Sequence, residues 1–163
     1  WRYTGGKNPY GYIGLGELFV FIFFGVVATT GSYFVQTNQI DVKIVAASIS
    51  MGAFACALLA INNIRDRALD ATVGKRTLAV RLGDRRSREF FSALIIVGYL
   101  AGFFAAFPWG FATLLTSPIA IGLIRRVRSE VQGAELIPAL AKTGQLQLLY
   151  SITFAAAILI AQI

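Results

Sequence analysis

Five long apolar runs, separated by short polar segments, organise the chain of 163 residues. Each run approaches the roughly 20 residues that an α-helix needs to cross a bilayer. The pattern predicts transmembrane helices at residues 15–36, 42–61, 90–107, 109–124 and 146–161. A Pro108-Trp109-Gly110 turn separates the third and fourth, because proline and glycine break helices. We therefore predict an all-α, polytopic membrane helical bundle, with residues 1–163 as a single membrane domain.

The composition supports a membrane protein and excludes several kinds of site. Hydrophobic residues make up 56% of the chain and charged residues 14%, whereas ordinary soluble domains carry about 25% charged residues. The single cysteine, Cys56, excludes an internal disulfide and a cysteine-based metal site. Because the chain has no histidine, imidazole catalysis and histidine-ligated metals are also excluded.

Basic residues fall almost entirely in alternate polar segments. The only Lys or Arg on the other side is Lys43. The residues on the rich side are Arg2, Lys7, Arg65, Arg67, Lys75, Arg76, Arg81, Arg85, Arg86, Arg88, Arg125, Arg126, Arg128 and Lys142. The positive-inside rule makes the rich side cytoplasmic. Residues 62–89 are therefore predicted to form a cytoplasmic loop, with the N-terminus inside and the C-terminus outside.

Small residues recur at four-residue spacing in two of the predicted helices. Such rows let helix backbones approach closely in lipid, so they predict helix–helix contacts. The first row is Ser48, Gly52, Cys56 and Ala60, and the second is Gly98, Gly102 and Ala106.

Two features near the cytoplasmic surface favour ordinary structural roles. Glu17 begins the first span, where an ionisable residue can mark a functional site, but its position near the interface favours contact with water. Residues 136–141 are interrupted by Pro138 and predict a short interfacial segment before the last span.

The most informative stretch, NNIRDRALDATVGKRT, begins at Asn62, where the second span reaches the cytoplasmic surface. If that helix continues, Asn62, Asp66 and Asp70 lie on one face, four residues apart. Two carboxylates at this spacing repel each other, and the C-terminal end of a helix disfavours negative charge. No basic residue lies three or four positions from Asp66, so we expect a divalent cation to supply the positive charge.

This stretch is suited to a magnesium ion bound to a lipid diphosphate. Mg²⁺ prefers a few carboxylate oxygens, retained waters and substrate phosphates, so Asp66 and Asp70 are candidate ligands. Gly74 predicts a left-handed helix end. Lys75 and Arg76 follow it and could contact the same phosphates. The alternative is a solvated, mixed-charge loop, since one Asp-x-x-x-Asp pair is a weak signal by itself.

The run NNIRDRALDATVGKRTLAVRLGDRRSREFF resembles the second aspartate-rich motif of the UbiA-type intramembrane prenyltransferases. Within this superfamily the chain is most similar to the 1,4-dihydroxy-2-naphthoate polyprenyltransferases of bacterial menaquinone synthesis. The segments YTGGKNPYGYIGLGELFVFIFFG and GAELIPALAKTGQLQLLY resemble the same family, so the resemblance covers essentially the whole chain.

The resemblance implies a nine-helix, multi-pass protein of the cell (plasma or inner) membrane, of which this chain supplies the last five helices. It implies that Asp66 and Asp70 are catalytic and hold Mg²⁺. The diphosphate-binding residues that it implies are Asn63, Arg65, Lys75 and Arg76.

The implied reaction transfers a polyprenyl chain from polyprenyl diphosphate to 1,4-dihydroxy-2-naphthoate and gives demethylmenaquinone. The alternatives are another aromatic acceptor, such as 4-hydroxybenzoate, and a non-catalytic membrane helper whose basic loops bind anionic lipid. The family's first four helices and first Asn/Asp motif have no counterpart here, and Asn38 and Asp41 lie in a loop on the opposite side. We therefore expect the chain alone to be inactive and to need those N-terminal helices as its partner.

Overall fold

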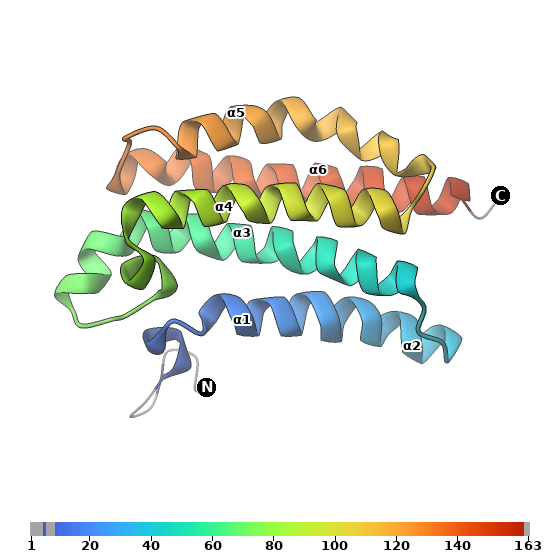
Figure 1. The fold of residues 1–163 in the computed structure, drawn as a ribbon, viewed down its shortest axis with the longest axis horizontal. Helices are drawn as coiled ribbons and strands as arrows, with labels where there is room; N and C mark the ends of the chain where they lie inside the picture. The colour runs from blue at the N-terminus through green and yellow to red at the C-terminus, as the bar shows by residue number, and fades with distance from the viewer. Residues whose placement is uncertain (1–4, 6–8, 162–163) are drawn as a thin grey trace.

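The computed structural model describes residue 5 and residues 9–161, and within those ranges it contains helices but no strands (Figure 1). The helical elements are η1 (Tyr10–Ile13), α1 (Gly16–Val20), η2 (Phe21–Thr30), α2 (Gly31–Thr37), α3 (Val42–Thr72), α4 (Leu78–Ala105), η3 (Trp109–Thr116), α5 (Ser117–Val127), η4 (Gly133–Leu136) and α6 (Ile137–Ala161). Arg2 and Lys7, which the charge pattern places on the cytoplasmic side, lie outside the described residues. The all-α prediction is confirmed.

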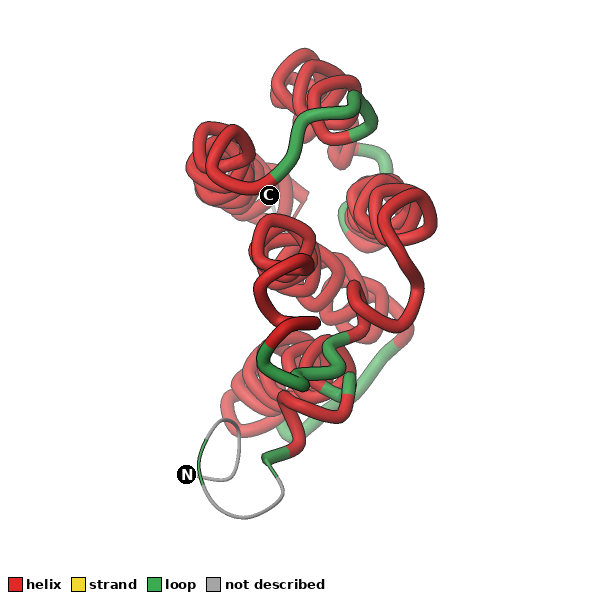
Figure 2. The backbone as a smooth tube through the Cα atoms, turned by 90° about the vertical axis from the view of Figure 1, so that its left-hand side faces the viewer, coloured by secondary structure: helices red, strands yellow, loops and turns green. Residues whose placement is uncertain are grey.

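Five helical rods are long and apolar enough to cross a membrane, as the apolar runs predict. The first combines α1, η2 and α2, and the fourth combines η3 and α5. Figures 1 and 2 place the first rod at one edge of the bundle, and α3 lies between it and the other three rods.

The prediction of a loop over residues 62–89 is wrong in its extent. α3 continues to Thr72 and α4 begins at Leu78, so only residues 73–77 lack helical structure. The physical reason is that the stretch after Asn62 is rich in good helix formers and has no glycine or proline before Gly74.

The N-terminal part of α4 is set at an angle to the rest of that helix. Thr77 caps the helix, with its hydroxyl accepting a hydrogen bond from the Val80 N–H at 3.4 Å. Gly83 then takes a φ of 77°, a conformation that glycine adopts without the steric cost that other residues bear. The kink at Gly83 therefore divides α4 into a short N-terminal segment and a longer remainder.

The separate interfacial segment predicted at residues 136–141 is also wrong. α6 begins at Ile137 and runs without interruption to Ala161. Pro138 lies in the first helical turn, where its missing N–H would have no helical partner in any case, so it does not break the helix. The predicted turn at Pro108 is confirmed, because α4 ends at Ala105 and η3 begins at Trp109.

The small-residue rows bring helices close together, as predicted. A Cβ atom on Gly25 of η2 would lie 2.8 Å from the Ser48 carbonyl oxygen and 2.9 Å from the Cα of Gly52 in α3. A Cβ atom on Gly98 of α4 would lie 2.7 Å from the Phe54 ring. All three distances are shorter than ordinary van der Waals contact, so larger side chains at these positions would push the helices apart.

A buried group of hydroxyls links three of the rods. The Ser50 hydroxyl of α3 donates to the Gly98 carbonyl of α4 at 2.8 Å and lies 2.8 Å from the Tyr150 hydroxyl of α6. All of these polar atoms are paired within the bundle. Hydrogen bonds of this kind contribute to helix association in lipid.

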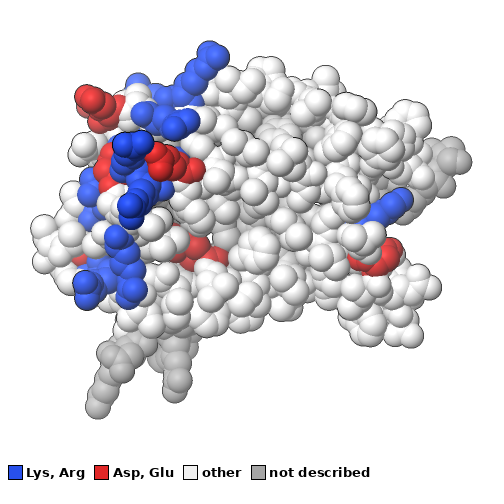
Figure 3. Space-filling model, viewed as in Figure 1, with Lys and Arg blue, Asp and Glu red and all other residues white. Residues whose placement is uncertain are grey.

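Charged side chains gather at one end of the bundle, where α3 and α5 end and α4 and α6 begin (Figure 3). We call this the basic end. The opposite end carries the loop before α3, where Asp41 accepts a hydrogen bond from the Ile44 N–H at 2.9 Å. That N–H holds the pKa of the Asp41 carboxyl below its usual range, since it favours the charged form. The tertiary structure thus separates the charges as the alternating pattern predicts.

The basic end is expected to face the cytoplasm. We expect a membrane-impermeant maleimide to label a Gln39→Cys variant in intact cells and an Arg76→Cys variant only after lysis, since both positions are exposed. The native Cys56 is 2% exposed and serves as the unlabelled background. Labelling of both introduced cysteines from the same side would contradict the assignment of the spans.

Candidate functional site

The aspartate-rich stretch ends α3 in a left-handed cap, as Gly74 predicts. Gly74 takes a φ of 76°, and its N–H bonds the Ala71 carbonyl at 3.3 Å. The Lys75 N–H bonds the Asp70 carbonyl at 2.9 Å. These two bonds define a Schellman motif, which satisfies carbonyls at the helix end and turns the chain back over the last turn. The turn therefore brings the Lys75 side chain to Asp70.

Asp70 is the most enclosed carboxylate of the motif, with 6% of the residue exposed. The Lys75 Nζ lies 3.1 Å from the Oδ1 atom of Asp70. The Oδ2 atom of Asp70 is buried and has no hydrogen-bond partner among the described residues. The Lys75 Nζ also lies 5.6 Å from the centroid of the Tyr12 ring, within range of a cation–π interaction. Asp70 thus keeps one oxygen available for a further ligand.

Asp66 differs from the prediction because it already has a cationic partner. Arg65 binds it through two parallel hydrogen bonds, with both N···O distances at 2.7 Å. The helical spacing of three or four residues predicts that no basic side chain of the motif forms an ion pair with Asp66. This prediction is wrong, because Arg65 is such a partner. The long, flexible side chain of an adjacent arginine can fold along the helix to reach its neighbour, which a spacing rule does not include.

Asn63 turns away from Asp66 and into the bundle. Its amide donates to the Glu17 Oε1 of α1 at 2.9 Å, and both residues are buried. The Cys56 thiol donates to the Glu17 carbonyl oxygen at 3.0 Å. The expectation that Glu17 reaches water is wrong, since it is 5% exposed. α3 packs against the first rod at the level of Asn63 and covers the Glu17 carboxyl, which the sequence position alone does not reveal.

Arg76 is exposed and forms no ion pair within the described part of the chain. Its backbone N–H donates to the Tyr12 carbonyl at 2.9 Å, which fixes the loop between α3 and α4 against η1. The structure therefore brings Asp66 together with Arg65, and Asp70 together with Lys75. It places Asn63 inside the bundle and leaves Arg76 free beside the motif.

A second group of charges near the motif was missed by sequence reasoning. Arg88 is buried, binds Asp84 at 2.7 Å and donates to the carbonyls of Val127, Ser129 and Val131. It thereby ties α4 to the end of α5 and to the segment between α5 and η4. The four-residue spacing of Asp84 and Arg88 was the available signal, although it does not reveal the distant carbonyls.

An apolar groove leads away from the motif along the same face of α3. The groove has two polar lining residues. Asn62 is the lining residue of α3 that stands nearest to the motif in the sequence, and Gln147 belongs to α6. The groove has a volume of about 430 Å³, and its other lining residues are Val20, Phe24, Ala55, Leu58, Leu59 and Leu140. Asn62 stands four residues before Asp66 and eight before Asp70. The face of α3 therefore changes from apolar to amide to carboxylate towards the basic end.

The two carboxylates fit part of a magnesium site. Asp70 has a buried oxygen without a partner, and the oxygens of Asp66 become available if Arg65 turns to another anion. Mg²⁺ needs only one or two carboxylates when substrate phosphates and waters complete its shell. No group of three or more Cys, Asp or Glu side chains that could hold a metal occurs among the described residues, so Asp66 and Asp70 have no third such ligand beside them there.

Comparisons with known proteins agree with these features. The model of the UbiA prenyltransferase family matches residues 1–138. The chain is 42% identical to the 1,4-dihydroxy-2-naphthoate octaprenyltransferase of Mycobacterium tuberculosis, over 100% of this chain and 56% of that protein. It is 34% identical to the protein of the same name in Escherichia coli, over 98% of this chain and 54% of that protein.

A more distant relative comes from an animal. The UbiA prenyltransferase domain-containing protein 1 of Rattus norvegicus is 32% identical, over 98% of this chain and 46% of that protein. The chain thus spans about half the length of the curated relatives it matches, and no solved structure matches it. The family model covers most of the chain, and the bundle has the expected helices with the aspartate-rich motif at the end of α3. The chain belongs to the UbiA prenyltransferase family.

Proposed function

We propose that this chain is part of a magnesium-dependent enzyme that transfers a polyprenyl chain from its diphosphate to 1,4-dihydroxy-2-naphthoate. The observation that carries the proposal is the face of α3, where an apolar groove leads through Asn62 to the carboxylates of Asp66 and Asp70. A polyprenyl diphosphate is built in the same order. Its long apolar chain matches the groove, and its charged head matches the end that carries the carboxylates. The names of the bacterial relatives support the naphthoate acceptor.

The residues of the motif would hold the diphosphate at the basic end of the groove. Asp66 and Asp70 would bind Mg²⁺, which supplies positive charge to the departing diphosphate. Lys75 and Arg76 would contact the phosphate oxygens directly, and Arg65 would turn from Asp66 to the same oxygens. Preorganised charge of this kind stabilises a leaving group without reorganisation during the reaction.

The Asn63–Glu17 pair would have a positioning role. By donating to Glu17, the Asn63 amide ties the last turns of α3 to the first rod, at the level where the groove reaches the motif. We therefore assign Asn63 to the alignment of α3 and not to direct contact with the diphosphate.

The chemistry requires a shielded cavity and an electron-rich acceptor. The carbon–oxygen bond to the diphosphate breaks, and the diphosphate leaves with the electron pair. The acceptor ring forms the new carbon–carbon bond and loses its carboxylate as CO₂. The product is the reduced form of demethylmenaquinone. The apolar lining of the groove would keep water from the allylic cation.

A membrane assay of the full-length protein, with the helices that its relatives possess, tests this proposal. We expect octaprenyl diphosphate and 1,4-dihydroxy-2-naphthoate to give prenylated naphthoquinol and CO₂ in equal amounts, only when Mg²⁺ is present. 4-Hydroxybenzoate serves as the competing acceptor. Preferential prenylation of 4-hydroxybenzoate would reassign the acceptor, and no transfer to any aromatic acceptor would reject the enzymatic role.

A further inference from the structure

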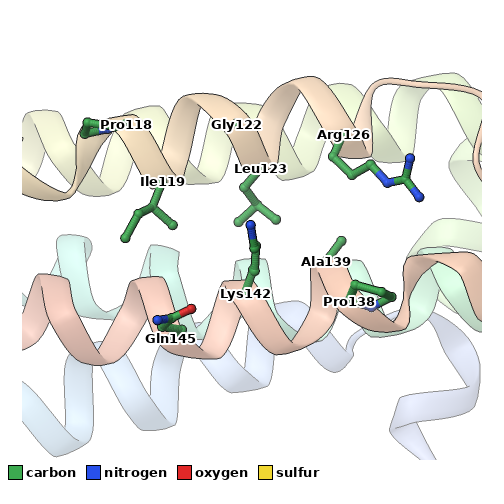
Figure 4. A pocket seen from close by; sticks show the side chains of 9 residues that line it. All are labelled: Pro118, Ile119, Gly122, Leu123, Arg126, Pro138, Ala139, Lys142 and Gln145. Carbon is green, nitrogen blue, oxygen red and sulfur yellow. The ribbon is translucent and has the colours of Figure 1, made fainter.

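A second groove lies between α5 and α6 and shares no lining residue with the groove beside Asn62 (Figure 4). Its volume is about 660 Å³, within the range of small-molecule sites. Ile119 and Leu123 give α5 an apolar wall, and the early turns of α6 form the opposite wall. The groove is therefore large enough to hold part of a lipid molecule.

Two cations enter this groove from opposite walls. Arg126 lies in the last turn of α5, and Lys142 extends from α6 towards α5 in Figure 4. Both residues are exposed, and neither forms an ion pair with another described residue. No Asp or Glu lines the groove. A cavity with two such cations and no carboxylate attracts an anion.

Arg126 lies nearer the basic end than the apolar residues of α5, and Lys142 lies on α6 opposite Leu123 (Figure 4). Arg126 stands near the basic end, whereas Ile119 lies seven residues earlier on α5, or about 10 Å further into the bundle. Gly122 lies between them, and a Cβ atom there would meet no other atom within 4 Å. The groove therefore suits an anionic group at the membrane surface with an apolar chain running inward.

We propose that the α5–α6 groove binds an anionic glycerophospholipid from the leaflet at the basic end. Its phosphate lies between Arg126 and Lys142, and one acyl chain follows Ile119 and Leu123. Arginine offers a planar pair of donors to phosphate oxygens, and lysine adds a point charge. Gln145 lines the same groove and can donate to a glycerol ester. Basic pockets between transmembrane helices on the cytoplasmic side bind lipid head groups in this way.

A further helix of the full-length protein is the competing occupant. An apolar helix in this groove would remove Arg126 and Lys142 from water without an acidic partner, and burial of unpaired charge is costly. A lipid phosphate neutralises both cations in place. Because the groove is separate from Asp66 and Asp70, the inference does not depend on prenyl transfer.

The test measures phosphatidylglycerol bound to the full-length protein by native mass spectrometry, after titration in mild detergent with phosphatidylcholine as reference lipid. The double variant R126Q/K142Q should weaken phosphatidylglycerol binding at least about tenfold and leave phosphatidylcholine binding unchanged. Its matched control is R125Q/R128Q, which removes the same charge from the same end but alters no residue that lines the groove. This control should change binding less than about twofold.

A steric variant keeps every charge in place. Gly122→Leu fills open space in the groove, and Gly144→Leu fills open space elsewhere on α6, so the two form a matched pair. We expect Gly122→Leu to weaken binding as strongly as R126Q/K142Q, and Gly144→Leu to have little effect. Circular dichroism and the melting temperature verify that all four variants are folded.

Three results would overturn the proposal. Equal weakening by R126Q/K142Q and R125Q/R128Q would show diffuse attraction to the basic end. Displacement of the lipid by millimolar inorganic phosphate or by micromolar farnesyl diphosphate would assign the groove to a free anion or to the prenyl donor. Undiminished binding in both Gly122→Leu and R126Q/K142Q would place the lipid elsewhere, as expected if a further helix fills the groove.

Discussion

Replacing Asp70 or Asp66 by Asn in the full-length protein should lower prenyl transfer at least about 100-fold, the effect typical of a lost transition-state stabiliser. The physical reason is that each carboxylate would hold part of the magnesium shell on the diphosphate. Asp70 should show the larger effect, because its buried Oδ2 has no other partner while Asp66 is also bound by Arg65. The measurement is initial rate against Mg²⁺ concentration, and Asp70→Asn should require more Mg²⁺.

The matched control for this pair is Glu89→Gln. Glu89 also lies at the basic end and loses the same charge, but its ion pair with Arg85 is exposed and lies outside the aspartate-rich stretch. Exposed pairs of this kind contribute little to stability, so near-normal transfer is expected. If Asp66→Asn or Asp70→Asn retained the rate and Mg²⁺ dependence of the parent, the metal-binding role of that residue would be rejected.

Residues 1–163 alone should transfer no prenyl group above background, and co-expression with the missing helices should restore transfer. The reason is the small number of metal ligands. Among the described residues, Asp66 and Asp70 have no third Cys, Asp or Glu side chain beside them. Asp66 and Asp70 lie on one face of α3, so they can hold a magnesium-bridged diphosphate from one side of a cavity only. The relatives also have about twice the length of this chain.

The measurement is transfer in membranes that contain this chain together with the unmatched part of the Mycobacterium tuberculosis relative. That relative is suitable because it is 42% identical over the whole of this chain, so its helices should accept the small-residue surfaces. The mixture should exceed either part alone by at least about 100-fold. The control mixture carries Asp70→Asn and should remain inactive. Robust transfer by residues 1–163 alone would require a complete site within this chain.

The class of protein and the position of the motif could be predicted from local properties of the sequence. Apolar runs of membrane-spanning length predict five helices, and the part of the chain that the structure describes contains five helices of that kind. Gly74 predicts the end of α3, because the left-handed cap depends on that residue and its immediate neighbours. The gathering of Lys and Arg at one end follows from their alternation along the chain.

The partners of individual polar residues could not be predicted in this way. Asn63 was expected beside a diphosphate, yet its amide binds Glu17 at a sequence separation of 46 residues. Arg65 was expected to bind phosphate, yet its guanidinium binds the Asp66 carboxylate. A long, flexible side chain can reach several acceptors, and its residue number alone does not identify the acceptor that it binds. Spacing rules describe which residues share a helix face, but not which rod covers that face.

The sequence by itself determined the number of helices, the basic end and the stripe of Asn62, Asp66 and Asp70 on α3, because these depend on the helical period and on burial of apolar runs in lipid. Only the tertiary structure decided that Glu17 is covered and that Arg126 and Lys142 face one groove. Contacts between distant segments depend on how closely helices approach. That approach is governed by complementary side-chain shapes, which no single segment contains.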